Sequence, residues 1–210
     1  MNLHLLSRSM GRPKKISDSQ ILSMAFEVIS LEGFESFTLE QAGKATGLSP
    51  AALVKRFKTK KRLAFLARNQ KWDENIAKMN ASEIAQLKGL NGIFEFLRLI
   101  AKSVDSKRLG EHARWLGTEA DDSKAKKKVA AYFAETRNIF SRLIQEAVSN
   151  QEIKIIGTPE NLAITLEALV QGSIFQFAFL NEQNIGRHLA NRFQSVLGPL
   201  TLTAQDNGAL

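Results

Sequence analysis

Apolar residues recur along most of this chain with the spacing of amphipathic helices. The first such stretch places apolar residues on one helical face, at Ile21, Leu22, Ala25, Phe26 and Ile29. Ser17 and Gln20 ahead of it have the spacing of a capping box, in which each side chain accepts from the other residue's backbone N–H. Gly33 suits the left-handed position that commonly ends a helix. The pattern predicts a helix over residues 17–31.

Two short helices in close order follow. Thr38 and Gln41 repeat the capping-box spacing, and Gly47 ends this helix after about two turns. Ser49 is then a helix cap, with Pro50 at the first helical position, where its missing N–H costs nothing. The turn between the two short helices is brief and contains a glycine. Together with the amphipathic helix before it, this arrangement is typical of a helix-turn-helix.

Helical spacing continues and predicts further helices over 59–79, 93–104, 110–116, 123–149, 159–181 and 185–197. Prolines are few, at positions 13, 50, 159 and 199, and the one alternation of apolar residues lies inside a stretch of helical spacing. We therefore predict an all-α fold. Its expected parts are a flexible basic N-terminal arm (1–15), a three-helix helix-turn-helix domain (16–62) and a larger helical domain (63–210).

The charge of the chain is concentrated in its first third. Residues 1–71 hold 13 Lys and Arg against 5 Asp and Glu, whereas the remaining residues hold 16 of each sign. A basic segment on a neutral body is expected when that segment meets a polyanion. Nucleic acid is the commonest such polyanion, because cations that bind phosphate release its counterions. A chance excess of solvated lysines is the alternative interpretation of the charge alone.

Six of these cations fall within eight residues, at Lys55, Arg56, Lys58, Lys60, Lys61 and Arg62. The last three stand at the predicted start of a helix, where positive charge opposes the helix dipole. A phosphate at that helix start would remove the conflict, because it would accept from the free N–H groups and pair with the cations. A second basic segment, residues 11–15, is either an arm that enters the minor groove or a disordered tail.

Several classes of function find no support in the sequence. The chain has no cysteine, which excludes disulfides, thiolate metal sites and cysteine nucleophiles. Its histidines, His4, His112 and His188, lack metal-ligand spacing, and no phosphate-cradling glycine loop, nucleophile elbow or His-Glu-x-x-His motif occurs. We expect no enzymatic activity, no metal and no cofactor. No apolar run approaches the roughly 20 residues of a membrane span, and we expect a cytoplasmic protein.

Residues 21–66 resemble the helix-turn-helix of the tetracycline-repressor-like (TetR) family of bacterial transcription regulators. The resemblance is carried, in the order of the family pattern, by Gly33-Phe34, Thr38, Ala42, Gly47-Leu48-Ser49, Leu53, Phe57, Lys60 and Leu63. Val54 departs from the pattern, because the family commonly has a tyrosine there that touches the DNA backbone. The resemblance implies an N-terminal DNA-binding domain followed by a domain for ligand binding and dimerisation.

The resemblance also implies roles for individual residues in binding double-stranded DNA. Thr38 and Lys60 correspond to contacts with the DNA backbone, although Thr38, like Ser49, is also a helix cap on the local pattern. Lys55 is the candidate for a contact with guanine O6 and N7 in the major groove. The expected DNA-binding residues are Arg12, Lys14, Thr38, Ser49, Pro50, Ala51, Ala52, Lys55 and Lys60.

The neutral body is expected to bind a second copy of the chain and a small molecule. The helices predicted over 159–181 and 185–197 carry more apolar surface than one core stripe needs, and a second copy is the economical cover. The expected interface residues are Leu166, Leu169, Val170, Ser173, Ile174, Phe177, Leu189, Phe193 and Val196. Candidates for lining a ligand cavity, with ordinary core packing as the alternative, are Phe94, Leu97, Trp115, Phe133, Phe140 and Phe175.

The resulting hypothesis is a repressor that binds a palindromic operator as a homodimer and is released by a small-molecule effector. In this mechanism two recognition helices stand about 34 Å apart, one turn of DNA. The alternative is a DNA-binding factor that acts as an activator or without ligand control.

Overall fold

The computed structural model describes residues 16–104, 109–110, 120, 122–180 and 182–202. Its helices are α1 (Asp18–Glu32), α2 (Leu39–Thr46), α3 (Pro50–Phe57), α4 (Lys60–Met79), α5 (Ser82–Ala85), α6 (Gly89–Ser103), α8 (Ser123–Ser149), α9 (Pro159–Phe177), α10 (Ile185–Leu197) and the 3₁₀ turn η2 (Gly198–Leu200). Extended pairing within the described residues is confined to one isolated antiparallel bridge, between Ile153 and Thr201. The predicted all-α fold is confirmed.

Helix bounds differ from the sequence-based prediction in a few places. α6 begins at Gly89, four residues before the predicted start, and the short α5 was not predicted. α9 ends at Phe177, earlier than the predicted end at residue 181. The helix predicted over 110–116 lies, apart from its first residue, outside the described residues.

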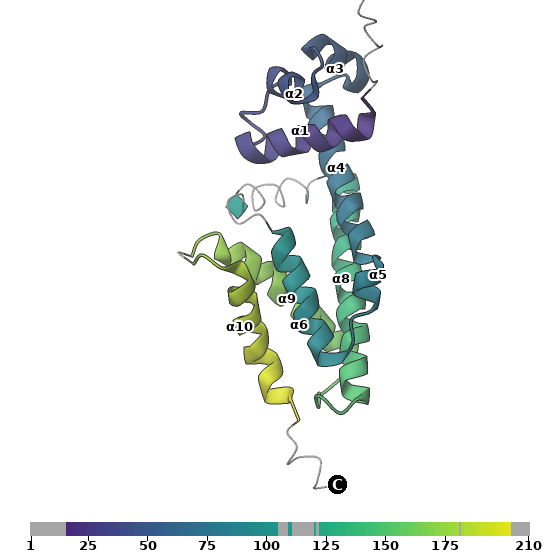
Figure 1. Ribbon diagram of the computed structural model, residues 1–210, viewed down its shortest axis with the longest axis vertical. Coiled ribbons are helices and arrows are strands. Elements are labelled where there is room, and N and C mark those ends of the chain that lie inside the picture. The colour runs from purple at the N-terminus through teal and green to yellow at the C-terminus, as the bar shows by residue number, and fades with distance from the viewer. Residues whose placement is uncertain (1–15, 105–108, 111–119, 121, 181, 203–210) are drawn as a thin grey trace, which may run out of the picture. The chain divides into compact units, whose positions relative to one another are not determined.

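The chain divides into two compact units, and the division falls between Arg68 and Asn69, within α4. In the first unit α1, α2 and α3 gather around the first turns of α4 (Figure 1). Its core consists of side chains with no exposed surface: Ile21, Ala25, Ile29, Phe37, Ala42, Leu53 and Leu63. Burying a large apolar side chain contributes about 1.5–3 kcal/mol, so several of them together can hold three short helices in place.

The turn of the helix-turn-helix depends on two glycines. Gly47 ends α2 with φ +71 and ψ +16, a left-handed conformation that glycine adopts without a steric penalty. A Cβ on Gly43 would stand 2.6 Å from the carbonyl oxygen of Leu48, closer than real contacts allow. Both predicted capping boxes are present, Ser17 with Gln20 at α1 and Thr38 with Gln41 at α2. Local hydrogen bonds therefore set the starts of α1 and α2.

The second unit is built around α8, its longest helix, which packs against α9 and α6, while α10 packs against α9 and α6. Three aromatic rings link these helices through the core. The ring of Phe140 on α8 lies 5.1 Å from that of Phe96 on α6 and 5.7 Å from that of Phe193 on α10. All three side chains are at most 1% exposed. None of the described helices is both long enough and apolar enough to cross a membrane.

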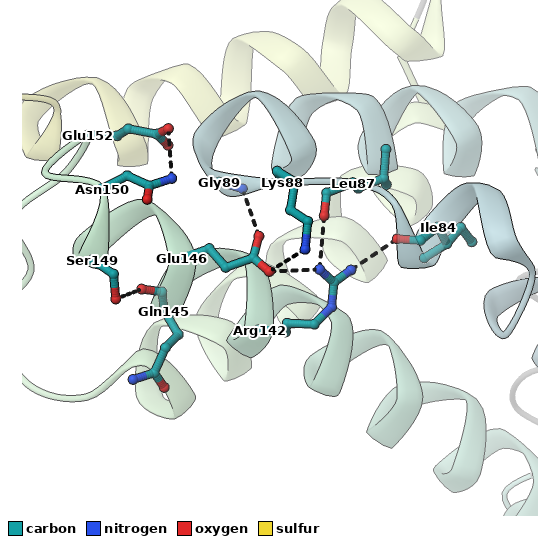
Figure 2. Close-up of polar contacts among 10 residues, drawn as sticks. All are labelled: Ile84, Leu87, Lys88, Gly89, Arg142, Gln145, Glu146, Ser149, Asn150 and Glu152. Atoms are coloured by element: carbon teal, nitrogen blue, oxygen red, sulfur yellow. Dashed lines mark hydrogen bonds and ion pairs between the residues drawn. The ribbon is translucent and has the colours of Figure 1, made fainter.

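A polar network joins the start of α6 to the end of α8 (Figure 2). Arg142 donates to the carbonyl oxygens of Leu87 (2.9 Å) and Ile84 (3.0 Å), and so ties α8 to the segment before α6. The carboxylate of Glu146 accepts from Lys88 Nζ at 3.1 Å and from the N–H of Gly89 at 3.2 Å. These charged side chains bind backbone groups at the start of α6 and in the segment before it, so the role of the network is structural.

Charge and hydrogen bonding also set the protonation of this network. Burial acts to raise the pKa of Glu146, but the hydrogen bonds from Lys88 and Gly89 and the charges of Lys88 and Arg142 outweigh it. The pKa of Glu146 is therefore lower than that of a free glutamate. The neighbouring acid Glu152 accepts from the N–H of Leu90, at a point where a Cβ on Gly89 would collide with it.

Candidate nucleic-acid interface

Helix α3 separates a buried face from an exposed one. Ser49 caps it, with Oγ accepting from the N–H of Ala52 at 3.2 Å, and Pro50 occupies its first turn as predicted. Leu53 is fully buried and Phe57 is 4% exposed, so these two side chains anchor the helix in the first unit. The opposite face presents Ala51, Val54 and Lys55 to solvent, while Pro50 and Ala52 are half-buried beside it. The outer face therefore carries small side chains near its start and a cation further along.

The two residues predicted to contact the DNA backbone, Thr38 and Lys60, differ in their exposure and in the contacts of their side chains. Thr38 is exposed, and its Oγ1 accepts from the N–H of Gln41 at 3.2 Å as the cap of α2. Lys60 is half-buried at the start of α4, where Nζ donates to the carbonyl oxygen of Glu35 at 3.2 Å and lies 5.3 Å from the ring centre of Phe34. One of its three N–H donors thus holds the loop between α1 and α2. Its predicted phosphate contact stays a prediction.

The cationic cluster predicted from the sequence contains residues of two kinds. Arg56 is tied down: its Nη1 and Nη2 donate to the carbonyl oxygen of Ile16 at 3.2 and 3.1 Å, and Nη2 lies 3.2 Å from Asp18 Oδ1. This guanidinium joins the end of α3 to the start of α1. The side chains of Lys55, Lys58, Lys61 and Arg62, in contrast, are exposed and have no ion pair within the described residues. Arg12 and Lys14 lie outside the described residues.

The candidate ligand-binding residues that the structure describes differ in their burial. Leu97 and Phe140 are core residues, at 3% and 0% exposure, and Phe94 packs against the same core. Phe175 is 52% exposed on α9. Phe133 is half-buried, with its ring 6.1 Å from that of Tyr132, and Trp115 lies outside the described residues. Leu97 and Phe140 are thus packed in the core, and the ligand-lining role of the six candidates stays a prediction.

Most of the predicted interface residues are also taken up inside the chain. Leu166, Val170, Ser173, Ile174, Phe177, Leu189 and Phe193 are at most 9% exposed, and Leu169 and Val196 are half-buried. Side chains covered within their own chain offer little surface to a second copy, and their assignment to a dimer interface stays a prediction. The helices α9 and α10 face α6 and α8 on the side that was expected to face a partner.

The exposed apolar surface of α9 lies on its other side. Ile164, Phe175 and Phe179 are 49%, 52% and 73% exposed. With the exposed Ala168 and Gly172 they recur every three or four residues, and so share one face of the helix and the turn that follows it. The rings of Phe175 and Phe179 lie 5.2 Å apart. The spacing of apolar residues in the sequence already contains this stripe, but it does not distinguish the exposed stripe from the buried one.

The structure also buries polar groups that sequence reasoning missed. Glu167 is 7% exposed; burial raises its pKa, while the charge of Arg137 and a hydrogen bond from Gln171 act to lower it. Burial and the charge of Glu167 raise the pKa of Tyr132 to about 12. His188 is 4% exposed, with Nδ1 3.0 Å from Glu182 Oε2. Among the described residues no group of three or more acidic, histidine or cysteine side chains is arranged to hold a metal ion.

Comparison with known proteins agrees with this geometry. The family model described as bacterial regulatory proteins, tetR family, matches residues 21–66, which span most of α1, all of α2 and α3, and the start of α4. No curated protein matches the chain. Among solved structures, NemR of E. coli in its reduced form is 14% identical, with a TM-score of 0.68 over 90% of this chain and 100% of that one.

Two further structures share the fold over most of the chain. A TetR-family transcriptional regulator from Cytophaga hutchinsonii is 15% identical, with a TM-score of 0.65 over 90% of this chain and 100% of that one. FadR of Bacillus subtilis, solved in complex with stearoyl-CoA, is 16% identical, with a TM-score of 0.60 over 88% and 100% of the two chains. The two-part helical fold is thus that of known regulators. Residues 21–66, the helix-turn-helix segment of this chain, therefore match the tetR family of bacterial regulatory proteins.

Proposed function

We propose that this chain is a DNA-binding transcription regulator that acts in the cytoplasm as a homodimer on a two-fold symmetric operator. The observation that carries the proposal is the outer face of α3, where small residues and Lys55 lie beside cations that have no partner among the described residues. This face belongs to the segment that matches the family model. No enzymatic role is proposed.

The outer face of α3 suits the major groove. Ala51 and Ala52 add little bulk at the start of the helix, so the backbone can approach base edges, and a methyl group can contact thymine. Lys55 stands one turn further on and can reach guanine O6 and N7. Thr38 and Lys60 are the proposed contacts to the DNA backbone on either side. These contacts fix the register of α3 on the duplex.

The stripe on α9 is the proposed surface for the second copy. Ile164, Phe175 and Phe179 expose large apolar side chains there, which is costly for a free surface and favourable once covered. Gly172 lies between them, and a Cβ placed on it would meet no atom within 4 Å, so another helix could approach closely at this point. A two-fold interface brings the same stripe from both copies together. Binding of such a dimer to a palindromic operator requires its two α3 helices to stand about 34 Å apart, one turn of DNA.

Control by a small molecule is the finer part of the proposal. FadR, which shares the fold, was solved in complex with stearoyl-CoA, and the helical body of this chain is the proposed place for a small-molecule effector. An effector that binds better to the DNA-free arrangement of the dimer releases DNA through its differential affinity. Action as a repressor follows if the operator overlaps a promoter.

A selection experiment tests the core of this proposal. The full chain, immobilised, would be offered a pool of duplexes with a random central segment, washed at rising salt, and the retained DNA sequenced. We expect retention that weakens with salt and enriches an inverted repeat whose half-sites are one helical turn apart. Absence of salt-sensitive retention of any duplex would refute DNA binding, and enrichment of single, unpaired half-sites would refute the dimer.

A further inference from the structure

The short connection between α3 and α4 contains a backbone conformation that is rare for a lysine. Lys58 has φ +72 and ψ −53, and the N–H of Thr59 donates to the carbonyl oxygen of Phe57 at 2.9 Å. A hydrogen bond across one residue with these angles defines a γ-turn of the strained, positive-φ type. Among the described non-glycine residues, a positive φ recurs only at Gln151.

Packing on both sides holds the turn in this conformation. The N–H of Lys58 donates to the carbonyl oxygen of Val54 at 2.8 Å and closes α3, and Thr59 Oγ1 accepts from the N–H of Arg62 at 3.0 Å and caps α4. The anchors of the two helices, Phe57 and Leu63, are buried. The chain must therefore reverse within Lys58 and Thr59.

The turn does not explain why its central residue is a lysine. Glycine adopts a positive φ readily, whereas a residue with a Cβ is strained there. The structure gives the Lys58 side chain no stabilising task, because it is exposed and has no hydrogen bond or ion pair among the described residues. A side chain kept at a strained position, without a role in the fold, points to a role outside it.

The charges around Lys58 indicate what it meets. Lys55, Lys61 and Arg62 are also exposed and without ion pairs in the described part of the chain, whereas Arg56 and Lys60 are held by backbone carbonyl oxygens. Lys58 thus stands among free cations, at the corner between the exposed face of α3 and the start of α4. Such a position favours an anion with several negative charges in a row, which is the chemistry of a duplex backbone.

We propose that Lys58 is a DNA-backbone contact, and that the strained turn serves to hold its ammonium against a phosphate beside the groove that α3 enters. The inference rests on the proposed function. It adds Lys58 to the expected set of DNA-binding residues. The backbone strain at Lys58 and the charge of its side chain can be measured separately.

Three variants at this position separate strain from charge. Lys58→Gly removes both, Lys58→Ala removes the charge but keeps a Cβ in the turn, and Lys58→Arg keeps the charge and the Cβ. Lys154→Ala is the matched control, because Lys154 is an exposed lysine of the second unit. Each full-length protein would be measured for its Tm and for binding to a fluorescent duplex of mixed sequence, about 30 base pairs or three helical turns long, over a salt series.

The expected results differ between the variants. Lys58→Gly raises Tm by roughly 2–4 °C, as expected when backbone strain is relieved, and Lys58→Ala leaves it near wild type. Both weaken binding roughly tenfold at 0.1 M salt, because each bound chain neutralises one phosphate fewer, and both lower the slope of log affinity against log salt by about 1 per bound chain. Lys58→Arg and Lys154→Ala retain the wild-type slope.

Each contrary result has a separate meaning. A wild-type protein that shows no salt-dependent binding to the duplex refutes the proposed function and this inference with it. Wild-type binding that Lys58→Ala leaves unchanged in affinity and slope refutes the inference alone. A Tm of Lys58→Gly equal to that of Lys58→Ala refutes the assignment of strain to the turn.

Discussion

Arg56 and Lys55 are adjacent cations that the structure places in opposite roles, and replacing each with alanine should therefore have opposite consequences. The Arg56 guanidinium donates twice to the carbonyl oxygen of Ile16, at 3.2 and 3.1 Å, and pairs with Asp18 at 3.2 Å. The Lys55 side chain is exposed, with no ion pair among the described residues. We predict that Arg56→Ala destabilises the first unit and that Lys55→Ala does not.

The magnitude follows from the partners of the guanidinium. A hydrogen bond from a charged group that is shielded from water contributes about 1.5–3 kcal/mol to stability. The Arg56 side chain is 28% exposed, which reduces this contribution. The Asp18 side chain is 65% exposed, so its ion pair adds between zero and about 1 kcal/mol. A net destabilisation of about 1–2 kcal/mol is therefore expected for Arg56→Ala. For a chain of this size it lowers Tm by roughly 2–8 °C.

Thermal unfolding followed by circular dichroism measures this difference, with DNA binding as the second readout. Lys55→Ala should unfold at the wild-type temperature and lose discrimination at one base position of a selected operator. Arg56→Lys is a further control, since a lysine keeps the charge but cannot reproduce the two-pronged geometry, and it should recover only part of the stability. The reasoning is refuted if Arg56→Ala and Lys55→Ala unfold at the same temperature.

The remaining predictions concern the second unit. Phe140→Ala should lower the free energy of unfolding by about 3–5 kcal/mol, because it empties the space between the rings of Phe96 on α6 and Phe193 on α10. The loss is measured as a lower urea midpoint, and an unchanged midpoint would contradict the core packing. Because the pKa of Glu146 is lowered in the folded state, its contribution to stability is complete above about pH 4.3 and is lost as the pH falls through the folded-state pKa. Glu146→Gln should therefore flatten the acid side of a curve of Tm against pH. An unaltered curve would count against the network. Phe175→Glu should convert the proposed dimer into monomers in sedimentation velocity, whereas Ile156→Glu, at a fully exposed loop position, should not; equal behaviour of the two variants would rule out the stripe on α9 as the interface.

Local patterns accounted for most of the first unit. The capping boxes at Ser17 and Thr38, the glycine turn at Gly47 and the proline at the start of α3 all involve residues within a few positions of each other. Interactions of this range depend on the sequence immediately around them, so the helix-turn-helix could be placed before any tertiary contact was known. The same holds for α8 and α10, whose predicted bounds match the structure.

Partners distant in the sequence account for the errors. The start of α6 was predicted too late because its first turn is held by Glu146 and Glu152, more than fifty residues further on. α9 is apolar on more than one side, and only its neighbours show which side is core: Leu166 and Val170 face the body, while Phe175 faces solvent. Apolar spacing identifies the faces of a helix but not which of them a neighbour covers.

The sequence by itself determined that this chain is all helical, that it carries a basic helix-turn-helix with the pattern of the tetR family, and where most helices begin and end. Only the tertiary structure decided which charges are free and which apolar faces are covered. Arg56 and Lys55 are neighbouring cations in the sequence, yet one is held by the carbonyl oxygen of Ile16 and the other is left to solvent. The physical reason is that burial and pairing depend on what packs against a side chain, and those atoms come from distant parts of the chain.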